Sequence, residues 1–173
     1  MDTIGLARGI VRLSPYDPEW PTVFMNERRL LQGALALPTD SINRIQHVGS
    51  TSIPGMMAKP IIDIAVLVDS LETVEAWRKP LEKIGYWYKD DQSDVPDRRF
   101  FAKGPEQKRT VYLHIVNRGE FNRLLRFRDT LTNDQHLAAA YSHLKQQLAQ
   151  ANPEDRATYS RLKHDFIQGV LAP

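Results

Sequence analysis

The spacing of hydrophobic residues predicts two strong elements in the first half of the chain. Trp20, Phe24, Leu31 and Leu35 recur at near-helical spacing, which predicts a helix that starts near Pro18–Pro21 and ends near residue 35. Residues 61–68 (IIDIAVLV) form an almost continuous apolar run rich in β-branched residues. Such a run is typical of a central strand that is covered on both faces.

Weaker patterns predict the remaining elements. We expect a helix over 71–84, helices from about Glu120 onward, and strands over 7–13, 42–48, 98–101 and 109–116. Strands alternate with helices early in the chain, and helices gather late. This order predicts one α+β domain over residues 1–173, with a small mixed β-sheet and C-terminal helices.

Composition narrows the class of protein. The 173 residues fit one domain, and 42% hydrophobic with 25% charged residues is ordinary for a folded chain. The chain has no cysteine, which excludes disulfides and thiolate chemistry and leads us to expect a cytoplasmic protein. No apolar run is long enough for a membrane helix, and no signal peptide is visible. A net charge of +2, without an aromatic-basic stripe, gives no reason to expect a nucleic acid partner.

Asp63 interrupts the apolar run of the predicted central strand. An alternating pattern places it on the same face as Ile61, Ala65 and Leu67. A buried carboxylate without a partner costs several kcal/mol. It is therefore either hydrogen-bonded for structural reasons or placed there to bind a ligand, and the sequence leaves both interpretations open.

A Gly- and Ser-rich segment, HVGSTSIPG, precedes this strand. Gly49 permits close approach of the backbone to a ligand, and Ser50, Thr51 and Ser52 follow it with hydroxyl groups suited to phosphate oxygens. Lys59 adds a positive charge just before the strand. The alternative is an ordinary loop between two strands.

The combination of these two segments is more specific than either alone. Twelve residues separate Ser50 from Asp63, and a Gly-Ser followed at this interval by an acid on the next strand resembles the nucleotidyltransferase superfamily. The chain looks more specifically like a member of the GrpB family, a module also found fused to some dephospho-CoA kinases. The resemblance covers nearly the whole chain and rests on YDPEW (16–20), HVGSTSIPG (47–55), AKPIIDI (58–64), RRFF (98–101), LHIV (113–116), FRDTL (127–131), YSHLK (141–145) and DRATYSRLK (155–163). Thr130 and Thr132 stand where we expect Tyr and Arg in this family.

The resemblance implies a nucleotidyltransferase-like fold and a phosphate-binding loop at Gly49–Ser52. It also implies divalent metal ions, and Asp63 is the candidate Mg²⁺ ligand. The superfamily's second acid is missing, because position 65 is Ala. One carboxylate together with substrate phosphates could still hold a single Mg²⁺.

Two histidines could supplement Asp63. His47 is a candidate metal ligand, and His114, with Asp63, is a candidate catalytic residue. A hydrogen-bonded structural role is the alternative for each histidine.

Basic side chains supply further candidates. Arg99 and Arg109 flank a predicted hairpin and either contact phosphate or form its solvated edge. Arg128–Asp129 is expected to be an ion pair within a helix. The i,i+4 pairs Tyr141/Lys145 and Tyr159/Lys163 are expected to lock the last helices together rather than contact substrate.

Three functions follow from these observations. The first is binding of a nucleotide or another phosphorylated small molecule with Mg²⁺, with nucleotidyl transfer to an acceptor. The second is a non-catalytic phosphate-binding module, an accessory to coenzyme A synthesis by the fusion analogy. The third, an RNA-binding accessory domain, is disfavoured by the near-neutral charge.

Overall fold

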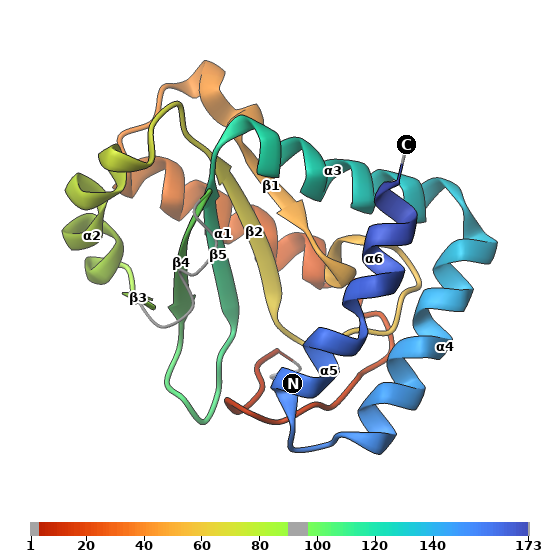
Figure 1. Ribbon diagram of the computed structural model, residues 1–173. Helices are drawn as coiled ribbons and strands as arrows, with labels where there is room; N and C mark the ends of the chain where they lie inside the picture. Colours follow the sequence, from red (N-terminus) through yellow and green to blue (C-terminus); the bar gives the residue numbers. More distant parts are fainter. Residues whose placement is uncertain (1–3, 90–96, 173) are drawn as a thin grey trace.

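A five-stranded mixed sheet forms the centre of the computed structural model, which describes residues 4–89 and 97–172 (Figure 1). The strands are β1 (Ile45–Val48), β2 (Ile62–Leu67), β3 (Tyr86–Tyr88), β4 (Arg98–Lys103) and β5 (Val111–Val116), in the order β1-β2-β5-β4-β3. Strands β2 and β5 are parallel, and the other neighbouring pairs are antiparallel. The predicted small mixed sheet is confirmed.

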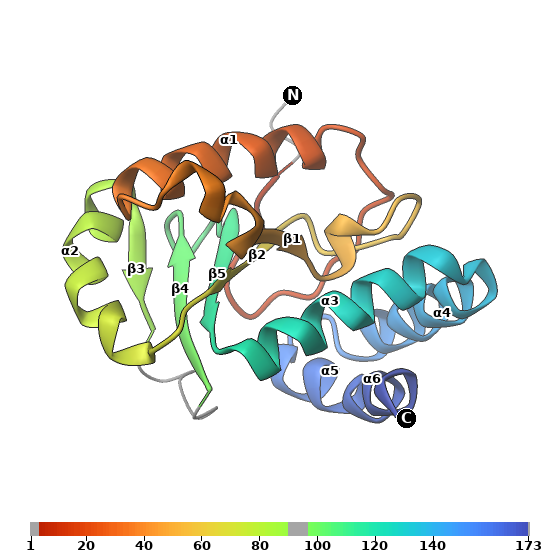
Figure 2. The same cartoon turned by 90° about the horizontal axis from the view of Figure 1, so that it is seen from above.

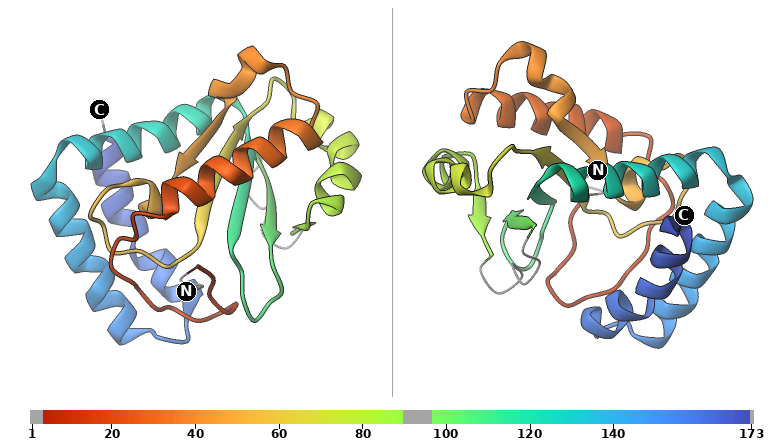
Figure 3. Two further views of the ribbon diagram at one scale, coloured as in Figure 1. Left: turned by 180° about the vertical axis from the view of Figure 1, so that it is seen from behind. Right: turned by 45° about the horizontal axis from the view of Figure 1, so that its top comes forward.

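Helices cover both faces of this sheet (Figure 2). Helices α1 (Trp20–Ala34) and α2 (Val74–Lys83) pack on one face, and α1 runs across the strands in the left view of Figure 3. Their apolar side chains meet Ile62, Ile64 and Val66 of β2 in the largest core cluster. On the opposite face, Ala65 and Leu67 meet Phe121 of α3 (Arg118–Asn133). Strand β2 is thus buried on both faces, as its sequence predicted.

The last three helices stand beside the sheet rather than on it. They are α4 (Gln135–Ala151), α5 (Arg156–Leu162) and α6 (His164–Leu171), and Figure 1 shows them together at one side of the molecule. An apolar cluster that includes Ile53, Phe127 and Tyr141 joins α4 and α6 to α3 and to the segment before β2. Within the described ranges, no helix is both long and apolar enough to cross a membrane.

Short 3₁₀ turns complete the described part of the fold, and one of them corrects a prediction. They are η1 (Thr39–Arg44), η2 (Ser50–Ser52) and η3 (Leu71–Thr73). Because η1 takes up residues 42–44, the strand predicted over 42–48 begins only at Ile45. The strand β3 was not predicted, since three residues carry too little periodicity for a strand assignment.

The strand predicted over residues 7–13 is wrong. Gly5 and Gly9 have positive φ angles of 113° and 89°, and these turn the chain away from an extended path. The segment makes only isolated bridges on either side of that range, from Leu6 to Arg109 and from Ser14 to Ala58.

Candidate functional site

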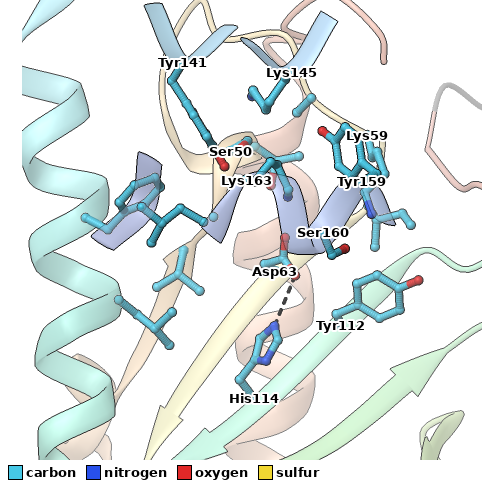
Figure 4. Close-up of a pocket in the computed structure, with 18 of the residues that line it drawn as sticks. Ser50, Lys59, Asp63, Tyr112, His114, Tyr141, Lys145, Tyr159, Ser160 and Lys163 are labelled. Carbon is cyan, nitrogen blue, oxygen red and sulfur yellow. Dashed lines mark hydrogen bonds and ion pairs between the residues drawn. The ribbon is translucent and has the colours of Figure 1, made fainter. Parts of the chain in front are cut away.

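A cavity of about 340 Å³ lies between the sheet and the C-terminal helices (Figure 4). Gly49, Ser50 and Thr51 line it beside Asp63 of β2, and its wall also includes residues of the segment before β2 and of β4, β5 and α3–α6. Its volume is at the lower end of the range of about 300–1,000 Å³ that is usual for small-molecule sites. The cavity is therefore the candidate functional site.

Asp63 faces this cavity instead of being sealed in the core. Its side chain retains 30% of its accessible surface, and its Oδ1 lies 3.1 Å from Nε2 of His114. The parallel register of β2 and β5 places His114 opposite Ala65. Since Asp63 and Ala65 point to the same face of β2, the side chains of Asp63 and His114 share one face of the sheet. Asp63 and the loop at Gly49–Thr51 after β1 thus line the same cavity, as the sequence predicted.

The charge state of Asp63 follows from opposing effects. Burial raises the pKa of its carboxyl, but the hydrogen bond and charge of His114, together with Lys59 and Lys163, lower it below the usual value. The carboxylate is therefore ionised at neutral pH. The Nδ1 atom of His114 is buried without a hydrogen-bond partner. His114 therefore acts on Asp63 through Nε2 and positions it.

Gly49 brings the loop close to this carboxylate. It has φ +70°, and a Cβ placed on it would lie 2.7 Å from Oδ2 of Asp63. Val48, the residue before it, pairs with Asp63 across β1 and β2. Only a residue without a side chain fits between the loop and Asp63.

The other predicted residues of the loop differ in where they point. Ser50 and Thr51 line the cavity, whereas Ser52 donates its hydroxyl to the carbonyl oxygen of Gly49 at 2.6 Å and does not. The Thr51 hydroxyl also lies 3.0 Å from Nε2 of His47.

His47 lies behind the loop rather than in the cavity. Its ring stacks on Phe24 with 4.9 Å between the ring centres. Burial, supported by the charge of Arg128 and opposed by that of Asp63, lowers the pKa of His47 to about 4. Its ring is neutral and packed, so its position suits a structural role and not the metal ligand predicted from the sequence.

The donor set does not fit a metal ion held by the protein. In residues 4–89 and 97–172, no three His, Asp or Glu side chains come together. Asp63 is the one acidic side chain that lines the cavity in this part of the chain, and one of its oxygens already accepts from His114. These described residues offer Mg²⁺ a single carboxylate, so substrate phosphates and water would have to supply its remaining ligands.

Positive charge dominates the cavity wall instead. Three lysines line it, namely Lys59 in the segment before β2, Lys145 on α4 and Lys163 between α5 and α6. Burial first, and then the neighbouring positive charges, lower the pKa of Lys59 and of Lys145 to about 7 and that of Lys163 to about 8.

Two tyrosine rings hold these lysines. The ammonium of Lys145 lies 4.7 Å from the ring centre of Tyr141, and those of Lys59 and Lys163 lie 5.6 Å and 4.6 Å from that of Tyr159. Tyr141, Lys145, Tyr159 and Lys163 all line the cavity, so the two i,i+4 pairs do more than pack helices. Their repeated spacing was visible in the sequence, but their convergence was not.

The arginines that line the cavity are not the predicted ones. Arg98, Arg123 and Arg156 do so, and the Arg156 guanidinium lies 4.9 Å from the ring centre of Tyr112. Arg109 is buried elsewhere, where it donates to the carbonyl of Gly104. Arg99 donates to the carbonyl of Arg98 and does not line the cavity either.

Comparison with known proteins places the chain among GrpB proteins. The "GrpB protein" family matches residues 10–172. The UPF0157 protein PA4798 of Pseudomonas aeruginosa is 37% identical over 93% of this chain, and the chain spans 66% of that relative. A dephospho-CoA kinase of Mycolicibacterium paratuberculosis is 39% identical over 50% of this chain and 21% of its own length.

Solved structures with a similar fold include a GrpB protein and Cid1. The crystal structure of the conserved protein GrpB from Enterococcus faecalis has a TM-score of 0.82 and 36% identity, and covers 92% of this chain and 94% of that one. Cid1 in complex with its short product ApU has a TM-score of 0.50 and 14% identity over 80% of this chain and 43% of that one. The second likeness shows a nucleotidyltransferase-like fold and nothing beyond it.

Proposed function

Since the chain belongs to the GrpB family, with a nucleotidyltransferase-like fold, we propose that its cavity binds a nucleotide or another phosphorylated small molecule. The observation that carries this proposal is the charge of the cavity wall. Six Lys and Arg side chains face one carboxylate among the described lining residues. A wall with this surplus of positive charge favours an anionic ligand.

The loop at Gly49 supports the same ligand class. Ser50 lines the cavity and carries a hydroxyl group, whereas the Thr51 hydroxyl lies against His47. Hydroxyl donors next to cationic side chains are the usual partners of phosphate oxygens. The rings of Tyr112, Tyr141 and Tyr159 add apolar area for the rest of the ligand.

The proposal is for binding rather than for nucleotidyl transfer. No second carboxylate stands beside Asp63 in the described part of the cavity wall, and we derive no reaction step through a metal ion. The predicted transfer reaction stays a prediction. A role as an accessory to coenzyme A synthesis is a related proposal, supported by the partial likeness to a dephospho-CoA kinase.

Calorimetric titration with matched ligands tests the proposal. We expect ATP and dephospho-CoA to bind and adenosine not to bind, because the cavity recognises the phosphate groups. A ligand at a hundred times its Kd should also stabilise the fold by about 2.7 kcal/mol. Equal binding of adenosine and ATP, or no binding of any phosphorylated compound, would refute the proposal.

A second assay separates binding from transfer. Pyrophosphate release from nucleoside triphosphates is measured with Mg²⁺ or Mn²⁺ for the wild type and for Asp63→Ala. We expect ligand stabilisation without release. Release that depends on Asp63 would instead establish the transfer reaction predicted from the sequence.

A further inference from the structure

Three lysines from distant parts of the chain meet above Asp63 in the cavity (Figure 4). Lys59 comes from the segment before β2, Lys145 from α4 and Lys163 from the junction of α5 and α6. We call these three residues the lysine cluster. The packing of the C-terminal helices beside the sheet brings the cluster together.

The protein itself does not neutralise the lysine cluster with an ion pair. Lys145 is 1% exposed and donates to the carbonyl oxygen of Met57, while Lys59 and Lys163 lie near the ring of Tyr159. No carboxylate in the described part of the chain is within 4.0 Å of their nitrogens. Grouping like charges in a partly desolvated site is unfavourable. A negatively charged ligand would relieve this repulsion and would therefore bind favourably there.

The position of the lysine cluster also opposes a divalent cation. The superfamily resemblance leads one to expect Mg²⁺ at Asp63, but the charges of Lys59 and Lys163 act on that same carboxylate. A cation placed there would be repelled by both ammonium groups. The ammonium groups themselves can neutralise the charge of a phosphate group beside Asp63.

Resting on the proposed function, we propose that the lysine cluster is a subsite for linked phosphate groups and binds them without a divalent metal ion. The amount of charge indicates the class of ligand. A bound anion favours the charged form of each lysine, and Lys59, Lys145, Lys163 and Arg156, once all charged and set against Asp63, leave more positive charge than a phosphate monoester of about −1.5 to −2 can balance. A ligand with a di- or triphosphate chain matches the subsite better than one with a single phosphate.

Titration with inorganic tripolyphosphate and with orthophosphate, both in EDTA, tests this proposal directly. We expect tripolyphosphate to bind at least about tenfold more tightly than orthophosphate, and added Mg²⁺ not to tighten it. Lys145→Met and Lys163→Met should each weaken binding about tenfold or more, since each removes a charged hydrogen-bond donor. Lys163→Arg should recover most of the affinity, because it keeps the charge.

Lys79→Met is the matched control, because Lys79 is exposed on α2 and does not line the cavity. Circular dichroism of each variant separates lost binding from lost folding, and Lys163→Arg keeps the test valid if a methionine variant unfolds. Binding of ATP that requires Mg²⁺ and is indifferent to the lysine variants would overturn this inference and leave the proposed function standing. No binding of ATP or tripolyphosphate under any condition would remove both.

Discussion

Gly49 and Asp63 are so close that the Cβ which Gly49 lacks would lie 2.7 Å from Oδ2 of the carboxylate. The contact joins the loop after β1 to the one acidic residue on β2. It explains why a glycine stands at this point of the segment HVGSTSIPG. The backbone here adopts φ +70°, which residues with side chains rarely adopt.

Replacing Gly49 by alanine should destabilise the protein by about 1–3 kcal/mol, because strain and a clash with Asp63 add together. Gly55→Ala is a matched control. Gly55 has φ +76°, but a Cβ there meets nothing within 4 Å. Urea denaturation of both variants measures the difference, and equal losses would show that the contact with Asp63 is unimportant. Adding Asp63→Ala to Gly49→Ala should restore part of the stability.

Replacing His114 by phenylalanine should raise the pKa of the Asp63 carboxyl. In the wild type, the hydrogen bond and charge of His114 oppose the effect of burial. Without them, only the charges of Lys59 and Lys163 oppose the effect of burial, so the protonated acid becomes more favourable than in the wild type. A carboxyl-carbon NMR titration of Asp63 gives the pKa directly, and His143→Phe, at an exposed position of α4, serves as the control. An unchanged pKa would contradict the positioning role of His114.

The free energy of unfolding of the unliganded protein should rise as the pH increases from about 7 to about 9. The pKa of Lys59 and of Lys145 is lowered to about 7, and that of Lys163 to about 8, mainly by burial. From pH 7 upward the folded state therefore binds fewer protons than the unfolded chain, in which lysine titrates near 10.4. Stability rises with pH wherever the unfolded state binds more protons. Arg156 and Lys163 also oppose charge on Lys59, and Asp63 favours it.

Denaturation at several pH values checks this slope. Lys145→Met should reduce it, and Lys79→Met should not. Above about pH 10 the effect reverses, because burial raises the pKa of Tyr141 and Tyr159 and the folded state then retains protons that the unfolded chain loses. A flat or falling profile between pH 7 and 9 would contradict the buried lysine cluster.

Arg128 should contribute about 1–3 kcal/mol to stability, since it ties α3 to β1. It donates to the carbonyl oxygen of His47 at 3.0 Å and to Oε1 of Gln46 at 3.1 Å, and it forms the predicted ion pair with Asp129 at 2.7 Å. Arg128→Ala leaves the carbonyl of His47 without this donor. Arg126→Ala, at an exposed position of the same helix, should cost less, and urea denaturation of the two variants decides. A smaller loss of stability for Arg128→Ala than for Arg126→Ala would contradict a stabilising link between α3 and β1 through Arg128.

Predictions from the sequence were most accurate where the signal was local. The apolar run around Asp63 predicted the bounds of β2 to within one residue at each end. The spacing of Trp20 and Phe24 predicted the helix α1. The strand over 7–13 failed because its alternation did not reveal that Gly5 and Gly9 turn the chain. Arg99 and Arg109 point away from the cavity, which no spacing in a predicted hairpin could show, because the partner strand fixes which face a side chain occupies.

The amino-acid sequence alone determined the types of the main elements and the association of Gly49 and Ser50 with Asp63, because hydrophobic periodicity and motif spacing act over a few residues. The tertiary structure decided what surrounds that carboxylate. Lys59 is separated by many residues from Lys145 and Lys163, and they meet only because α4, α5 and α6 pack against α3 and the segment before β2. Burial within that packing lowers the pKa values of the lysines, and the convergence of these side chains on one wall gives the cavity its surplus of basic groups.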